Sequence, residues 1–97
     1  MSKKTVDTEV HTIRISETMA DRIHRAGIGV LIEENIDHQF QKGDLVKFIV
    51  TENYFSSLET MHDIDDEVYA INSVYSGRGV EQRFVVLLVT RDSKKGD

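Results

Sequence analysis

Polar side chains that could contact a ligand gather between residues 11 and 37. His11 and Arg14 lie three residues apart, and Arg22 and Arg25 follow with the same spacing. An imidazole titrates near neutral pH, and a guanidinium forms paired hydrogen bonds with phosphate and stacks on nucleobases. This chemistry predicts binding of a phosphate-bearing or similarly polar ligand. The candidate ligand-binding residues are His11, Arg14, Arg22, Arg25, Glu34 and Asp37.

Several of these residues also have a structural interpretation. His11 alternates with Ile13 and Ile15, so it shares their strand face and could be a partly buried histidine bonded to a neighbouring strand or loop. The arginines could form a basic patch around a helix. They could also lie on a solvated face, where Asp21 and Arg25 have the spacing of a weak surface ion pair.

Sequence patterns of known catalytic and metal sites are missing. The chain has no nucleophile elbow, no P-loop and no dinucleotide-binding glycine series. It has no cysteine, its histidines are never four residues apart, and the acidic run at residues 59–67 lacks the calcium-loop pattern and its glycine. We therefore expect no metal and no cofactor, name no catalytic residue, and favour binding over catalysis.

Alternating apolar residues predict the strands that position the candidate residues. The predicted strands cover residues 10–15, 29–35, 45–51, 68–75 and 84–90. A helix is predicted over residues 16–26, with Ser16 as its N-cap and Gly27 ending it in a left-handed turn. So many short strands with so few helices predict an α+β, mainly β fold. We expect a small β-barrel of about five strands, with one or two helices covering an end.

Three segments carry more specific expectations. Tyr69, Ile71, Ser73 and Tyr75 should share one face of their strand. Residues 84–90 are almost wholly apolar, which is typical of a strand covered on both faces. Residues 52–66 are either a short helix, because residues 54, 55, 58 and 61 have helical spacing, or an ordered loop.

Length and charge restrict the class of protein. The 97 residues suffice for one domain over 10–91, between a disordered tail at 1–9 and a polar tail at 92–97. No run of apolar residues is long enough to span a membrane, and no apolar signal segment or cysteine is present, so we expect a cytoplasmic protein. The net charge of −5 opposes tight non-specific binding to nucleic acid.

The order of motifs resembles a known family. The resemblance lies in three motifs: His11-x-Ile13-Arg14-Ile15, an apolar helix ending at Gly27, and Phe40-x-x-Gly43-Asp44 before a strand. In these motifs the chain resembles small bacterial and phage proteins of the PUA-like superfamily. These carry a domain of the activating-signal-cointegrator homology (ASCH) type. The resemblance covers roughly residues 10–91. It implies a PUA-like barrel with a cleft between the helix and the following strand, facing RNA, a nucleotide or a modified nucleoside.

The family's reactive motif is largely replaced in this chain. Some family members are small amidohydrolases acting on acylated nucleosides, and their motif continues from the glycine as G-K-x-x-x-E-x-R. Aligned from Gly27, its lysine, glutamate and arginine fall on Ile28, Ile32 and Glu34. A slip of one residue would place Glu33 in the acid position without restoring the two cations.

Three functional hypotheses follow. The first is a non-catalytic PUA-like domain that binds RNA, a nucleotide or a small polar ligand beside the helix at 16–26. The second is a protein-interaction module, in one version a homodimer, that uses a groove made apolar by Ile28 and Ile32. The third is a diverged nucleoside amidohydrolase, with His11 and Glu33 or Glu34 as the groups available for catalysis.

Overall fold

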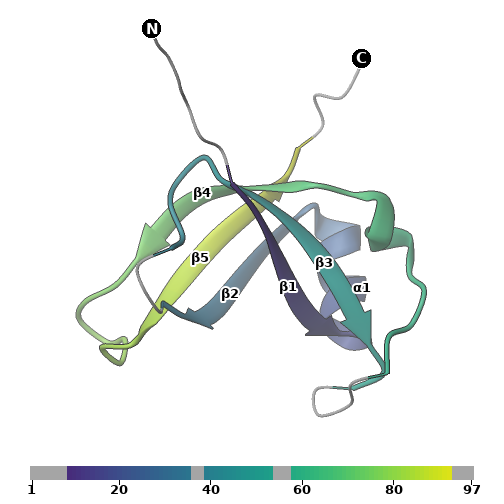
Figure 1. The fold of residues 1–97 in the computed structure, drawn as a ribbon, viewed down its shortest axis with the longest axis horizontal. Helices are drawn as coiled ribbons and strands as arrows, with labels where there is room; N and C mark the ends of the chain where they lie inside the picture. The colour runs from purple at the N-terminus through teal and green to yellow at the C-terminus, as the bar shows by residue number, and fades with distance from the viewer. Residues whose placement is uncertain (1–8, 36–38, 54–57, 93–97) are drawn as a thin grey trace, which may run out of the picture.

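A five-stranded sheet, curled into a half-barrel, carries a single α-helix in the part of the chain described here (Figure 1). The computed structural model describes residues 9–35, 39–53 and 58–92. The elements are β1 (Val10–Ser16), α1 (Glu17–Ala26), β2 (Ile28–Glu34), β3 (Leu45–Thr51), the 3-10 helix η2 (Asp63–Asp66), β4 (Tyr69–Tyr75) and β5 (Phe84–Arg91). The predicted α+β, mainly β class is confirmed.

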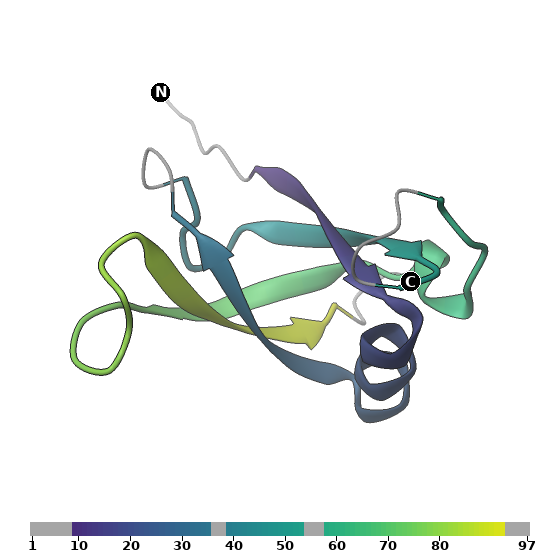
Figure 2. The ribbon, with the colours of Figure 1, turned by 90° about the horizontal axis from the view of Figure 1, so that it is seen from below.

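The first two strands of the chain form the two edges of the sheet. The strand order is β1-β3-β4-β5-β2, and β1 runs parallel to β3 while the other neighbours are antiparallel. Figure 2 shows α1 at one end of the sheet, joining the end of β1 to the start of β2. The helix therefore spans the opening between the two edge strands.

The helix begins and ends where the sequence predicts. The Ser16 side chain accepts a hydrogen bond from the backbone N–H of Met19 at 3.2 Å, which satisfies one N–H of the first turn. Gly27 adopts a left-handed conformation with φ of 74°, and its N–H donates to the Ile23 carbonyl at 2.7 Å. Ala20 and Ile23 are buried against the sheet. Within the described residues, no helix is long and apolar enough to cross a membrane.

The core lies on the concave side of the sheet and beneath α1. Inward-facing side chains alternate along β1, as Ile13 and Ile15 do, and likewise along β5. The Phe48 and Tyr69 rings pack edge to face with centroids 5.3 Å apart. The largest fully buried side chains are Tyr69, Ile23, Ile64, Ile71, Leu87, Val46, Val50, Val85, Val89 and Thr51.

The expectation that one face of the fourth strand runs from Tyr69 to Tyr75 is wrong. The register of β4 against β5 shifts between Ile71 and Ser73, which leaves one extra residue in β4. Beyond this bulge the faces exchange, so Val74 packs against the core and Tyr75 is 49% exposed. A period of two cannot reveal a bulge, because the bulge interrupts that period.

The segment before β4 contains a short helical turn, but not at the predicted spacing. Leu58 and Met61 are exposed, and Glu59 forms an isolated bridge with Thr51. The turn is η2, whose N-cap His62 accepts the Ile64 N–H through Nδ1 at 3.0 Å. The predicted helical positions 54 and 55 lie outside the described residues.

The outer face of β5 also differs from expectation. Val85, Leu87 and Val89 face the core and are buried, but Val86 and Leu88 on the other face are only half-buried. The apolar sequence of β5 predicts that both of its faces are covered by other elements. Among the described residues, no helix or strand packs on this outer face.

Gly29 in β2 is predicted to be important for stability, because α1 packs closely against it. A Cβ atom at this position would lie 2.8 Å from Cγ1 of Ile23, which is closer than packed carbon atoms tolerate. We expect Gly29→Ala to lower the free energy of unfolding by about 1–3 kcal/mol through overpacking of α1 on β2. Urea unfolding measures the loss, with Thr12→Ala on the exposed face of β1 as the control. An unchanged midpoint for Gly29→Ala would contradict this packing.

Candidate functional site: a cleft between the edge strands

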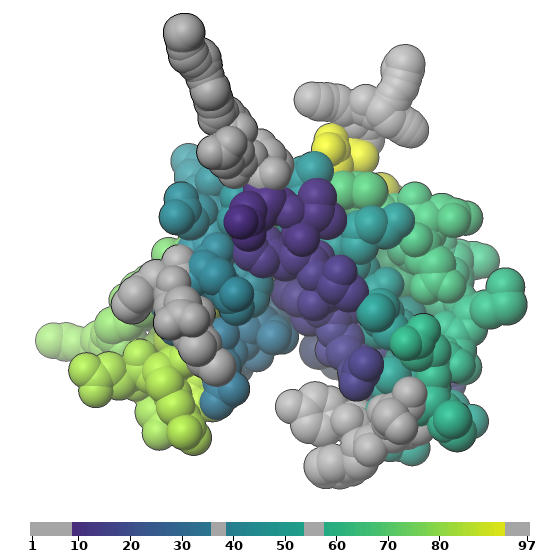
Figure 3. Space-filling view, viewed as in Figure 1, coloured from purple at the N-terminus to yellow at the C-terminus, as the bar shows by residue number. Residues whose placement is uncertain are grey.

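A cleft of about 380 Å³ lies between β1 and β2 beside the start of α1. We call it the seam cleft, because the half-barrel would close there if β1 and β2 paired. Figure 3 shows the surface hollowed between the purple atoms of β1 and the blue atoms of β2. The cleft is lined by Arg14, Ile15, Ser16, Met19, Val30, Leu31, Ile32 and Glu33.

Sheet topology places this cleft. Among the described residues, β1 pairs only with β3 and β2 pairs only with β5, so each strand keeps one edge without a strand partner there. The helix links the strands at one end and holds their edges apart. A ligand in the seam cleft can therefore meet strand backbone as well as side chains.

The seam cleft combines an apolar floor with two charged groups. Ile15 and Leu31 are buried, and Met19 packs against the same core. Arg14 is exposed on the β1 wall. Glu33 on the β2 wall is half-buried, and this burial raises the pKa of its carboxyl group. Such a site can take a flat apolar group on its floor, an anion at Arg14 and a hydrogen-bonding group at Glu33.

His11 takes part in a buried polar contact away from the cleft lining. Its Nε2 lies 2.8 Å from Oδ2 of Asp44, and both side chains are about nine-tenths buried. The His11 ring also packs on Phe40, with centroids 4.7 Å apart. These contacts favour the interpretation of His11 as a buried structural histidine over a role in ligand binding.

The Phe40-x-x-Gly43-Asp44 motif forms the other half of this contact. Gly43 has φ of 96°, a conformation that favours glycine, and its N–H donates to the Ile71 carbonyl at 2.8 Å. Asp44 Oδ2 also accepts the Gln41 N–H at 3.2 Å. Four of the residues that carry the family resemblance, His11, Phe40, Gly43 and Asp44, thus form one structural unit at the starts of β1 and β3.

Of the five candidate ligand-binding residues that the structure describes, only Arg14 lines the seam cleft. Arg22 and Arg25 are exposed on α1 outside its lining, and Arg25 acts electrostatically on Asp21. Glu34 is exposed at the end of β2, and Asp37 lies outside the described residues. The acidic residue in the cleft lining is Glu33. The family motif aligns with Glu33 only if the alignment is shifted by one residue.

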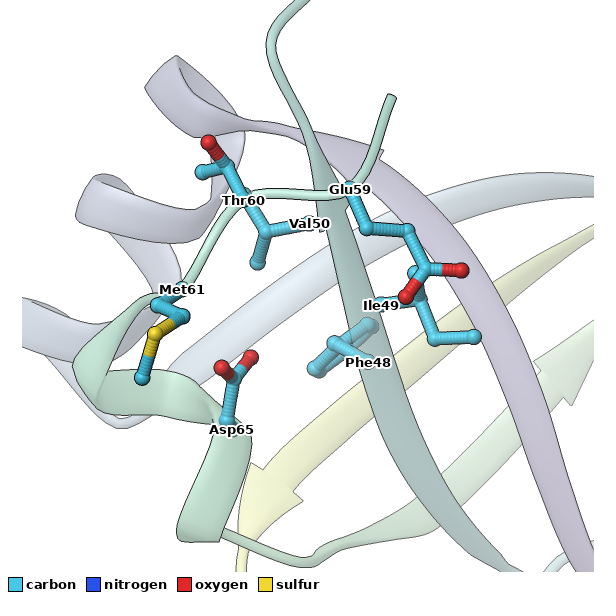
Figure 4. A pocket seen from close by; sticks show the side chains of 7 residues that line it. All are labelled: Phe48, Ile49, Val50, Glu59, Thr60, Met61 and Asp65. Carbon is cyan, nitrogen blue, oxygen red and sulfur yellow. The ribbon is translucent and has the colours of Figure 1, made fainter. Parts of the chain in front are cut away.

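A second cavity, of about 260 Å³, lies between β3 and the segment at residues 59–65. Figure 4 shows Phe48, Ile49 and Val50 of β3 on one side of it and Met61 and Asp65 on the other. The remaining lining residues are Glu59 and Thr60. Its lining includes two carboxylates and no basic residue, so it disfavours anions. No local sequence pattern indicates this cavity, because its two sides are separated in the chain and meet only in the folded structure.

A network of polar side chains lies at the end of α1 and was not predicted from the sequence. The Tyr69 hydroxyl donates to Glu67 Oε1 at 2.7 Å, and the Arg91 Nε lies 3.4 Å from the same oxygen. His24 Nδ1 lies 2.8 Å from the other Glu67 oxygen. Arg91 also donates to the His24 carbonyl. These residues are far apart in sequence, so no local pattern could reveal the network.

The charges of this network offset one another. Burial, followed by the hydrogen bond to Glu67, raises the pKa of Tyr69 to about 12. Burial opposes ionisation of Glu67, but hydrogen bonds from Tyr69 and His24 and the charge of Arg91 leave its pKa lowered. Tyr69 is fully buried and Glu67 is already engaged. We therefore assign this network to holding α1 on the sheet rather than to a ligand.

A scan of protein-family models finds no match to this chain, and a search of curated proteins finds none either. The assignment of the seam cleft as the candidate site therefore rests on its geometry.

The protonation of Glu33 should be visible in stability. Around pH 4 the Glu33 carboxyl group is mainly protonated in both the folded and the unfolded protein. As the pH rises above the ordinary pKa of 4.5, the unfolded chain loses this proton before the folded protein does. The stability contributed by neutral Glu33 is therefore lost as the pH rises through the higher pKa of the folded state. We therefore expect the free energy of unfolding of Glu33→Gln, measured relative to wild type, to increase as the pH rises from about 4 to about 7.

Urea unfolding at the two pH values checks this expectation. The lowered pKa values of Asp21 and Glu67 give the opposite pH dependence, but they are common to both proteins and cancel in the difference. Glu34→Gln, which makes the same change at the exposed neighbouring residue of β2, is the control. An equal difference between Glu33→Gln and wild type at both pH values would contradict the raised pKa.

His11 should matter for stability and not for ligand affinity. His11→Ala leaves Asp44 without its side-chain partner inside the fold, and we expect a loss of about 2 kcal/mol or more in unfolding free energy. Thermal and urea unfolding measure this loss, and the ligand titration described below measures affinity. Weakened ligand binding by a stably folded His11→Ala variant would return His11 to the binding site.

Proposed function

We propose that this chain is a non-catalytic PUA-like domain that binds a nucleotide, free or as part of short single-stranded RNA, in the seam cleft. One observation carries the proposal: Arg14 and Glu33 lie on opposite walls of a cleft whose floor is apolar. A base can lie against Met19 and Leu31, with its phosphate at Arg14. The cleft volume of about 380 Å³ is within the usual range for small-ligand sites.

The distribution of charge favours a short ligand over a long nucleic acid track. Arg14 is the one basic residue among those that line the seam cleft. The net charge of −5 repels a polyanion that extends beyond the cleft. The proposed ligand therefore places one phosphate, rather than a series of phosphates, against the protein.

The alternative of a diverged amidohydrolase has weaker support. Acyl transfer requires a general base and a group that stabilises the oxyanion. Glu33 is the one titratable acid in the cleft lining, and no lysine lies there. The Ser16 oxygen already accepts the Met19 N–H as a helix cap. We therefore propose binding without turnover, and expect acylated cytidines to remain intact when incubated with the protein.

Fluorescence polarisation of labelled short single-stranded RNA tests the proposal at low and moderate salt. Arg14→Ala should weaken binding about tenfold or more through loss of a charge-assisted hydrogen bond, with little change in thermal stability. For one phosphate contact, the logarithm of the affinity should fall against the logarithm of salt concentration with a slope of about −0.7. In Arg14→Ala this slope should approach zero.

Lys47→Ala is the matched control, because it removes an exposed cation from β3 outside the cleft lining. Nucleoside monophosphates, added as competitors, test whether a single nucleotide suffices. No saturable binding at low salt, or equal losses in Arg14→Ala and Lys47→Ala, would overturn the proposal.

A further inference from the structure

The outer surface of β2, β5 and β4 exposes large apolar side chains. Ile28, Val30 and Ile32 of β2 are 45%, 59% and 67% exposed, and Tyr75 of β4 is 49% exposed. Monomeric proteins rarely expose contiguous apolar patches of more than a few hundred Å². Single exposed apolar residues need no explanation, so what matters here is whether these residues adjoin.

The strand register shows that they do. Ile32 pairs with Val86, and Val86 pairs with Tyr75, so these three form one row across the strands. Val30 pairs with Leu88 in the next row. Cross-strand partners share a face of the sheet. The outer face is defined by six residues: Ile28, Val30, Ile32, Tyr75, Val86 and Leu88. Val30 and Ile32 also line the seam cleft, so the two surfaces adjoin along β2.

This face lacks the features that keep sheet surfaces soluble. Charged residues make up 30% of the chain, yet none of the six is charged, and Glu34 is the one charged residue on the outward side of β2. β2 is also an edge strand, where proteins usually place lysine, proline or a bulge to prevent unwanted association. The face therefore requires a cover of matching apolar chemistry.

Residues 1–8 and 93–97 do not have that chemistry. Residues 1–8 contain two apolar side chains, Met1 and Val6, and residues 93–97 contain none. A second copy of the outer face does have it. Because the face is uncharged, two identical copies can meet there without opposing like charges.

We propose that the outer face is the interface of a homodimer with two-fold symmetry, in which the β2-β5-β4 surface of one copy packs on that of the other. With the strands of the two copies antiparallel, Glu34 at one end of β2 lies over the opposite end of the partner's sheet. At that end, Ile28 pairs with Thr90, whose hydroxyl donates to the Asn72 side chain at 3.0 Å. The negative charges of the two Glu34 residues thus stay apart, near polar groups.

The area of the outer face suits a weak but specific dimer. Its four most exposed residues keep about half of their surface accessible, and Val86 and Leu88 add less. The apolar area that one copy offers therefore falls short of the ~800 Å² per partner that a standard interface buries. Dimerisation is therefore expected to depend on concentration.

Sedimentation velocity across about 10 μM to 1 mM tests the proposal. The wild-type mass should rise from 11.1 kDa towards twice that value. Ile28→Lys should weaken association tenfold or more, because it places charge inside the interface. Ile28 does not line the seam cleft, so ligand binding should persist in this variant. Val10→Lys is the control, because Val10 is 57% exposed on β1, outside the outer face.

Dilution of the isotope-labelled wild type, followed by NMR, provides a second measurement should Ile28→Lys fail to fold. Amide shifts should change with concentration at the outer face and not at β1. A wild type that stays at 11.1 kDa up to 1 mM would overturn the proposal and leave the face to a different protein. Growth beyond a dimer, which would indicate open-ended pairing of strand edges, or equal effects of Ile28→Lys and Val10→Lys would also overturn it.

Discussion

The parallel pairing of β1 with β3 is the constraint on which the rest of this structure depends. In the part of the chain that the structure describes, β3 is the one strand that pairs with β1 and so holds it in the sheet. The buried contact between His11 and Asp44 fixes the pairing at its start, where Phe40 packs on the His11 ring. From this point β1 carries Arg14 to the wall of the seam cleft and Ser16 to the cap of α1. A shift in this register would displace both groups.

The opposite wall of the cleft is fixed from the other end of the helix. Gly27 ends α1, and its carbonyl accepts the backbone N–H of Arg91 at 2.8 Å, which starts the pairing of β2 with β5. The network of Glu67, Tyr69 and Arg91 holds the same end of the helix. Both edge strands are thus secured to the sheet but not to each other. An open cleft is the direct consequence of this topology.

Much of the fold could be predicted from the sequence, because its signals are local. The alternation in β1, the Ser16 cap and the Gly27 termination each involve neighbouring residues, and all three are found in the structure. The bulge in β4 was missed because it adds a residue without a distinctive local pattern. The candidate site was only partly predictable. Arg14 was found, but Glu33 and the apolar floor meet it only because sheet topology places β1 and β2 at opposite edges.

The central claim is that the seam cleft receives a nucleotide, and residue-level mapping of binding tests it most directly. A titration of the isotope-labelled protein with nucleoside monophosphates, followed by amide chemical shifts, reports where the ligand lies. The account predicts saturable shifts concentrated at residues 14–19 and 30–33, on both walls of the cleft and the start of α1. Shifts confined to the exposed face of α1 around Arg22 and Arg25, or no saturable shifts, would contradict it.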